Sequence, residues 1–255
     1  MRYFLGLEVA RRRHGILVCQ RKFTLDLIAT LGLAGFKPTC TPLDTSHKLT
    51  SAEYDQANAH GSVDADELLS DPSNYQKLVG KLLYLTMTRA DISYAVENLS
   101  QFMHKPKKSH LEGAMRVVRY LKNALGLKIL LSSQSSDQLI VYCDADWATC
   151  PMTRRLVRWV CEKTRRLSYL MEVQKQNKVS RSSAEAEYRS MANAIAEVVW
   201  LTGLFKELNV DLKLPVSYIV TVKRLFRLMQ IPSTMKEPKI SRSTAILFKK
   251  RFSMA

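Results

Sequence analysis

The sequence predicts a mixed fold of helices and strands, α/β in the α+β sense. Three observations predict it. Two strand-like apolar runs, residues 3–9 and 15–19, flank a basic turn near the N-terminus. Residues 73–125 then carry apolar side chains at three- and four-residue spacing, which is typical of amphipathic helices. Further on, an apolar strand ends near Asp144 and a capped helix follows Ser182, so the second half also combines both element types.

Length and composition limit what the motifs can mean. With 255 residues the chain can form one large domain or two small ones. It has no apolar run of about 18 residues and no signal-peptide core, so we expect a non-secreted, intracellular protein that does not cross a membrane. Its five cysteines include no C-x-x-C pair, which argues against a disulfide framework and a zinc site. Neither the cellular compartment nor the oligomeric state can be predicted.

The net charge of +16 would ordinarily favour a nucleic-acid partner, because polyanion binding releases counterions from phosphates. Residues 156–174 and 218–255, however, supply ten of these sixteen charges. Both stretches lack a regular pattern, so the whole-chain charge indicates little about partners.

The first half reads as a hairpin, a short helix and a linker. The turn Arg11-Arg-Arg-His-Gly15 joins the first two strands, and its arginines are better explained by a solvated turn than by a phosphate site. Thr24–Leu31 reads as a helix that stops at Gly32, and 38–44 as an extended exit. Residues 45–72 are polar and without periodicity, which predicts a linker. Three helices should follow, near 73–87, 91–103 and 108–125.

The second half starts with two predicted strands, residues 126–131 and 138–142, paired around a polar turn. This pair should deliver Asp144 at the end of a strand. Ser182 and Glu185 form an S-x-x-E capping box for the next helix. Four residues of that helix predict its apolar face: Met191, Ile195, Val198 and Val199.

Carboxylates at a strand end and in the first turns of a helix suggest a metal site. Asp144 and Glu187 could face each other there, and hard cations such as Mg2+ prefer oxygen ligands. Spacing alone favours a second interpretation, in which Glu185 and Glu187 only interact with the positive end of the helix dipole.

Seven motifs give the chain a specific resemblance: Tyr3-Phe-Leu-Gly-Leu-Glu-Val-Ala10, Gln20-Arg-Lys-Phe23, Leu78-Val-Gly-Lys-Leu-Leu-Tyr-Leu85, Thr88-Arg-Ala-Asp-Ile-Ser-Tyr-Ala95, Arg119-Tyr-Leu-Lys122, Asp144-Ala-Asp-Trp147 and Ser182-Ser-Ala-Glu-Ala-Glu-Tyr-Arg189. In this order they resemble the Pol polyprotein of copia-type LTR retrotransposons, over residues 1–155 and 175–217. The resemblance implies four regions: the end of a reverse-transcriptase palm (1–44), a linker (45–72), a helical thumb or connection (73–125) and a ribonuclease H-like mixed sheet with helices (126–255).

The resemblance also implies catalytic residues. The polymerase uses paired aspartates in a Tyr-x-Asp-Asp turn, but this chain contains no Asp-Asp pair and begins downstream of the expected turn. We therefore expect no DNA synthesis by this chain alone. The ribonuclease H domain implies Mg2+, an RNA–DNA hybrid as partner and four acidic ligands. Asp144 and Glu187 match the first two ligands; the third and fourth acids have no match.

The third acid is replaced near Thr221. Plausible codons for Tyr218–Leu225, read two nucleotides later, give Tyr-Cys-Asp-Ser-Lys-Ala-Ala, which resembles the family pattern. A shifted frame similarly restores family-like strands from residues 156–174. We therefore hypothesise two frameshift lesions, with residues 156–174 and 218–255 aberrant. Because Arg158 and its neighbouring cations would compete for core positions, we expect this domain to be unstable or only partly ordered.

Three functional interpretations remain open. The first is an inactive Pol remnant. The second is a residual Mg2+-dependent ribonuclease H that recruits another acid, such as Asp146 or Asp211. The third is a nucleic-acid-binding protein without catalysis, which would use the helices of 73–125 and the basic tail.

Overall fold

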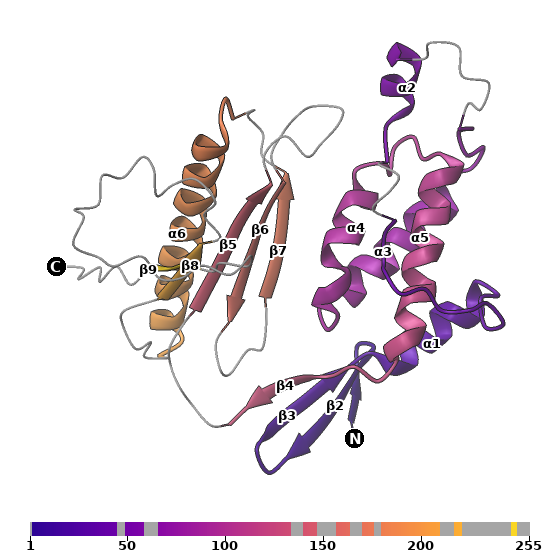
Figure 1. The fold of residues 1–255 in the computed structure, drawn as a ribbon. Helices are drawn as coiled ribbons and strands as arrows, with labels where there is room; N and C mark the ends of the chain where they lie inside the picture. Colours follow the sequence, from indigo (N-terminus) through magenta and orange to yellow (C-terminus); the bar gives the residue numbers. More distant parts are fainter. Residues whose placement is uncertain are drawn as a thin grey trace. The chain divides into compact units, whose positions relative to one another are not determined.

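The computed structural model describes residues 2–44, 49–58, 66–133, 140–146, 157–163, 170–175, 180–209, 217–220 and 246–248. The chain forms two compact units, Met1–Leu131 and Ser132–Ala255, here called the N-terminal and C-terminal units. Both contain helices and strands, which confirms the predicted fold class (Figure 1).

The N-terminal unit begins with a sheet in the order β1-β2-β3-β4. Its strands are β1 (Arg2–Phe4), β2 (Leu7–Arg12), β3 (Gly15–Cys19) and β4 (Ile129–Ser132). The predicted basic hairpin is confirmed, since β2 and β3 pair antiparallel with Val9 opposite Val18, but the strand expected at 3–9 is divided into β1 and β2. Between β1 and β2, Leu5 and Gly6 have φ angles of 46° and 78°. Such left-handed values at both central residues are typical of tight hairpin turns and favour glycine.

One strand pairing differs from the prediction. The strand expected at 126–131 is present as β4, but it lies next to β3 and not next to the strand at 138–142. The alternation of apolar residues identifies a strand and not its neighbour, so the sequence could not distinguish a local hairpin from a pairing with a segment about 110 residues earlier.

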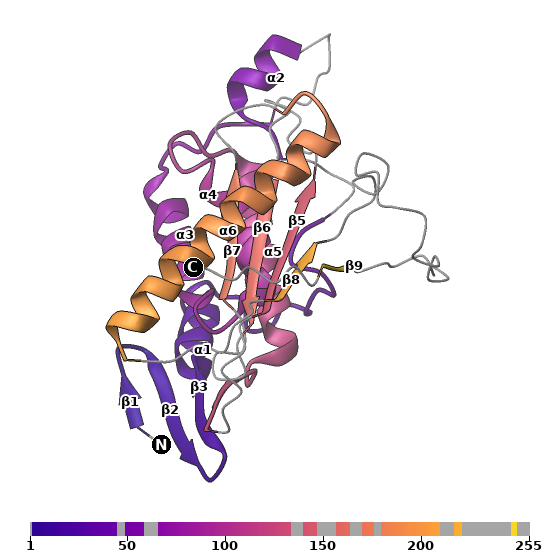
Figure 2. The same ribbon diagram turned by 90° about the vertical axis from the view of Figure 1, so that its left-hand side faces the viewer.

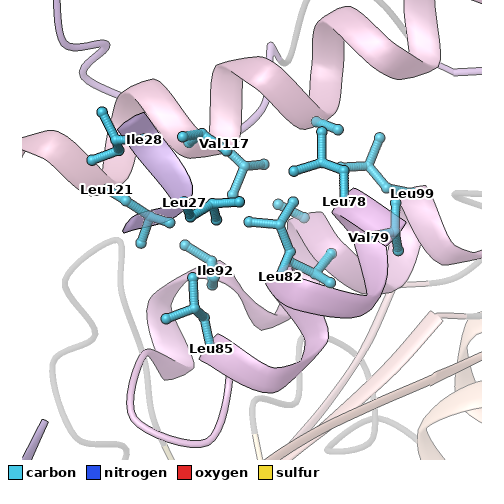
Figure 3. Close-up of a cluster of buried hydrophobic side chains, with 14 of the residues drawn as sticks. Leu27, Ile28, Leu78, Val79, Leu82, Leu85, Ile92, Leu99, Val117 and Leu121 are labelled. Carbon is cyan, nitrogen blue, oxygen red and sulfur yellow. The ribbon is translucent and has the colours of Figure 1, made fainter. Parts of the chain in front are cut away.

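Four helices build the core of the N-terminal unit: α1 (Arg21–Thr30), α3 (Ser73–Leu85), α4 (Ser93–Ser100) and α5 (Lys108–Leu121). The short 3-10 turns η1 (Ala90–Ile92) and η2 (Lys122–Ala124) precede α4 and follow α5. The predicted spacing is confirmed in α3, where Leu78, Leu82 and Leu85 are buried in one apolar cluster with residues of the other three helices (Figure 3). Gly32 ends α1 with a φ of 65°.

The predicted linker contains ordered structure. Residues 52–58 form a helix, α2 (Ala52–Asn58), and residues 66–72 lead directly into α3. Leu49 and Leu69 from this stretch pack against the apolar cluster. The sequence of this stretch is polar and without periodicity, so it gave no sign of this arrangement. Ion pairs contribute many of the contacts that hold the stretch on the N-terminal unit, and ion pairs leave no periodic apolar pattern.

The C-terminal unit contains a mixed sheet in the order β7-β6-β5-β8-β9. Its strands are β5 (Ile140–Asp146), β6 (Val157–Lys163), β7 (Leu170–Lys175), β8 (Ser217–Val220) and β9 (Ile246–Phe248). β5 runs antiparallel to β6 and parallel to β8. The helix α6 (Ser183–Glu207) packs on β5 and crosses in front of the strands in Figure 2.

Residues 156–174 have no clear strand pattern in the sequence, yet they supply β6 and most of β7. Within β6, Val157 and Trp159 flank Arg158, but the apolar residues Val160 and Cys161 interrupt the alternation, so a period of two covers only three residues. The antiparallel register with β5, which places Asp144 opposite Trp159, uses this run.

The predicted apolar face of α6 is wrong except at Val198. Ile195 and Val199 are exposed, whereas a row of mostly small residues is buried. The buried residues are Ala186, Glu187, Ser190, Ala194 and Val198. Small side chains let a helix approach a strand closely, so the packed face is the less hydrophobic one. With 25 residues α6 is the longest helix in the described part of the chain, where no helix has the length and hydropathy of a bilayer span.

Candidate metal site

β5 and β8 are parallel neighbours, and each leads in the sequence to a candidate position. Asp144 is the fifth residue of β5, and the last parallel pair joins Cys143 to Val220. The residues that follow this pair in the sequence are Asp144 and Thr221. Thr221 and the side chains of Asp144 and Asp146 lie outside the described residues. The register nevertheless relates the acid of β5 to the position at which the resemblance implies a third acid, and that position holds threonine.

Glu187 belongs to the buried row of α6. Its exposed fraction is 7%, and the row that contains it is the face that α6 packs against β5. The helix therefore directs this carboxylate into the C-terminal unit and not into solvent.

Glu185 has a different environment. It stands at the third helical position, where its backbone N–H donates to Ser182 Oγ at 3.1 Å. Its carboxylate accepts from the Arg181 N–H at 2.7 Å and pairs with Arg189. The Arg181 bond, together with the nearby cations, lowers the pKa of Glu185. The predicted N-cap, Ser182, is thus confirmed, although the Glu185 carboxylate bonds Arg181, the residue before the cap. For Glu185, the interpretation that the acid only interacts with the N-terminal end of the helix therefore applies.

The residues present do not fit a pair of metal ions. Two-metal hydrolysis needs carboxylates that hold both ions about 3.5–4 Å apart. Asp144 and Glu187 are the two acids in the expected places, and Thr221 offers no carboxylate. Within the described residues, no group of three His, Cys, Asp or Glu side chains is arranged to hold a metal. The donor set matches one weakly held Mg2+ at most. Asp146 ends β5, and Asp211 lies outside the described residues.

The resemblance motifs of the N-terminal unit form polar contacts with one another. Gln20, buried at the junction of β3 and α1, accepts a hydrogen bond from Thr88 Oγ1 at 2.6 Å. Its amide nitrogen donates to the Tyr84 carbonyl at 3.3 Å. Three separate motifs therefore meet at Gln20, which joins the sheet to the end of α3.

Arg89 forms a second contact of this kind. Its guanidinium makes two hydrogen bonds to Asp91, at 2.9 and 2.7 Å, and one to the Ala124 carbonyl at 3.0 Å. The guanidinium also lies 5.8 Å from the ring centroid of Tyr120. Burial opposes ionisation of Asp91, but the bonds and charge of Arg89 outweigh it and hold the pKa of Asp91 below its usual value.

Sequence reasoning missed the use of the cations on α5 and η2. Arg116 donates to the Thr41 carbonyl at 3.3 Å, Arg119 to the Lys37 carbonyl at 3.0 Å, and Lys122 to the carbonyls of Leu33, Ala34 and Phe36. These side chains hold the segment after α1 against α5. The only signal was cations three residues apart, which is equally typical of a solvated face or a nucleic-acid surface.

No family model and no solved structure matches the chain. Over 215 residues it is 38% identical to the retrovirus-related Pol polyprotein from transposon RE2 of Arabidopsis thaliana, which covers 84% of this chain and 14% of that protein. An uncharacterized mitochondrial protein of the same plant is 33% identical over 200 residues, 78% of this chain and 77% of that protein. The chain belongs to the copia-type retrotransposon Pol family.

A more distant member of the Pol family is the polyprotein from transposon TNT 1-94 of Nicotiana tabacum, 27% identical over 221 residues, 84% of this chain and 16% of that protein. These comparisons confirm the family that the motifs predicted. The chain spans 14% of the length of the RE2 polyprotein.

Proposed function

We propose that this chain is a remnant of the reverse transcriptase and ribonuclease H region of Pol. It has neither DNA polymerase nor hybrid-cleaving activity, and its expected partner is an RNA–DNA hybrid that it binds without cutting. A scaffold that keeps the family motifs, combined with an incomplete metal site, is the simplest combination that accounts for the residues.

The observation that carries the proposal is the register of β8 with β5. A mixed five-stranded sheet with helices on its faces is the fold that the family implies, and the parallel pair Cys143–Val220 precedes Asp144 and Thr221. An active site would need an acid where Thr221 stands. Without it, the bound metal could not stabilise both the attacking and the leaving oxygen of a phosphodiester.

Binding could use exposed cations of the N-terminal unit. Arg11, Arg12 and Arg13 are exposed on the β2–β3 hairpin, and Lys77 and Lys81 are exposed on α3. Binding through phosphates would weaken as salt concentration rises.

The test is a hybrid-cleavage assay with Mg2+ and with Mn2+, preceded by the nucleotide sequence of the transcript across codons 150–255. The matched control is a chain in which residues 156–174 and 218–255 are re-encoded in the shifted frames. We expect the control to cut the hybrid and the present chain to show cleavage no higher than its Asp144→Asn variant. Fluorescence anisotropy with the same labelled hybrid measures binding separately.

Metal-dependent cleavage by the present chain that Asp144→Asn abolishes would overturn the proposal. It would favour a ribonuclease H that recruits Asp146 or Asp211, and alanine variants of these two acids would identify which one.

A further inference from the structure

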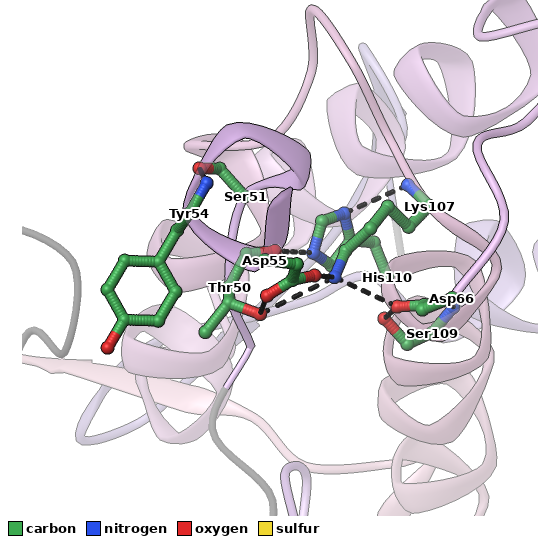
Figure 4. Close-up of polar contacts among 8 residues, drawn as sticks. All are labelled: Thr50, Ser51, Tyr54, Asp55, Asp66, Lys107, Ser109 and His110. Carbon is green, nitrogen blue, oxygen red and sulfur yellow. Dashed lines mark hydrogen bonds and ion pairs between the residues drawn. The ribbon is translucent and has the colours of Figure 1, made fainter. Parts of the chain in front are cut away.

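A polar cluster in the N-terminal unit joins three segments of the chain (Figure 4). Its centre is Lys107, immediately before α5, whose side chain is 3% exposed. Lys107 Nζ forms ion pairs with Asp55 of α2 and with Asp66, the latter at 3.0 Å. One buried ammonium group therefore holds two segments that flank residues 59–65.

His110 completes the cluster from the first turn of α5. It is fully buried and stacks on Phe102 with a centroid separation of 4.0 Å. Its Nδ1 accepts from the Lys107 backbone N–H at 3.0 Å, and its Nε2 lies 3.0 Å from the Thr50 carbonyl oxygen. Since Nδ1 accepts, Nε2 must carry the proton and donate to Thr50.

This geometry accepts only the neutral ring. A proton on Nδ1 would point at the Lys107 N–H, so a donor would face a donor, and the new charge would lie beside the Lys107 ammonium. Burial first, and the Lys107 charge second, lower the pKa of His110 from 6.5 to about 4, against the opposing bond to Thr50.

The remaining charged groups around the cluster are already paired. Asp66 also accepts from the Ser109 N–H at 3.1 Å, at the positive end of α5. Two pairs lie in solvent at the rim: Lys105 with Glu53, and Lys108 with Glu67. No group but His110 changes charge near pH 6 in this cluster.

We propose that the Lys107–His110 cluster is an acid-sensitive latch, which holds residues 49–58 on the end of α5 and releases them when the His110 ring is protonated. The buried side chains of α3, such as Leu82, lie in the apolar cluster and make none of the polar contacts of the latch. Release exposes the surface of α5 on which Leu49 packs, since Leu49 lies beside Gly113.

Three kinds of titratable group, the histidine, the two aspartates and the lysine, determine how the stability of the latch depends on pH. His110 has a lower pKa when latched, so latch stability is lost as pH falls from 6.5 toward 4. Burial opposes ionisation of Asp55 and Asp66, but the bonds from Lys107, Thr50 and Ser109 outweigh it and lower their pKa, so they add a loss only at lower pH. Burial likewise opposes charging of Lys107, but the two carboxylates outweigh burial and raise its pKa. The contribution of Lys107 to latch stability is therefore complete below its unfolded pKa and is lost as pH rises past its folded pKa.

The test is amide hydrogen exchange of the full chain at pH 7.5 and pH 5.0, normalised for intrinsic exchange rates. A ring with a pKa of 6.5 when open and about 4 when latched predicts that protection of residues 49–58 falls about 30-fold between these pH values. Protection of α3 should stay constant. Equal protection of residues 49–58 at both pH values would overturn the proposal.

Two variants and a spectrum separate the latch from general acid sensitivity. His110→Gln should remove the pH dependence, whereas His104→Gln, which replaces an exposed imidazole, should retain the 30-fold change. If His110→Gln does not fold, the NMR titration of the His110 ring in the unmodified chain decides, because a ring pKa near 6.5 would contradict the latch.

Discussion

In the N-terminal unit the family motifs contact one another, whereas in the C-terminal unit they lead to a site that needs further segments. Gln20 meets Thr88, and Arg89 lies over the ring of Tyr120, within one body of helices and sheet. Asp144 and Glu187 would act only together with an acid after β8. The proposed frame change at residue 218 would therefore leave the first set of contacts intact and remove the acid that the second set needs. Packing motifs tolerate distant damage that a catalytic site does not.

Leu82→Ala should give the largest effect on this contrast. Leu82 is fully buried in the four-helix cluster, so we expect a loss of about 3 kcal/mol in the unfolding free energy of the N-terminal unit. All three tryptophans, Trp147, Trp159 and Trp200, lie in the C-terminal unit. The urea midpoint of the unfolding transition monitored by circular dichroism should shift, while the midpoint monitored by tryptophan fluorescence should not.

Leu83→Ala is the matched control, since Leu83 is 38% exposed on the same helix. It should cost well under 1 kcal/mol. A shift of the tryptophan transition in Leu82→Ala would show that the two units unfold together, and the contrast between them would fail.

Thr88→Val tests the contact between motifs. The replacement keeps the shape of the side chain but removes the hydroxyl that donates to the buried Gln20 oxygen, which predicts a loss of about 1–2 kcal/mol. The measurement is again the urea midpoint of the circular dichroism transition.

Thr86→Val provides its control, because the Thr86 hydroxyl bonds only the Leu83 carbonyl of its own helix. We expect a change within about 0.5 kcal/mol. Equal effects of the two variants would mean that the Gln20 contact adds nothing specific.

Local patterns predicted much of the fold. The β2–β3 hairpin, the periodic helices α3 and α5, and the Ser182 cap all depend on residues close together in the sequence. The family also followed from motifs of neighbouring residues, and the comparisons confirm it.

Features that depend on distant contacts were missed. β4 pairs with β3 across more than 100 residues, and α2 is held by ion pairs to Lys107 and Lys105 and not by an apolar stripe. In α6 the buried row contains Ser190 and Ala194, so hydrophobicity selected the wrong face. For the candidate site, Asp144 and Glu187 stay a prediction from the motifs, while the different environment of Glu185 required the structure.

Ser182→Ala should give the smallest effect, and it acts on the other unit. Loss of the hydroxyl leaves the Glu185 N–H without its cap, which predicts a loss of about 1 kcal/mol. Because Trp200 lies on α6, the urea midpoint of the tryptophan fluorescence transition should shift. The unfolding transition of the N-terminal unit, which contains Leu82, should not. Ser183→Ala, one residue inside the helix, should change the transition little. If Ser182→Ala instead leaves tryptophan unfolding unchanged, α6 does not contribute to the cooperative stability of the C-terminal unit, and Glu187 then has no rigid support from which to bind a metal.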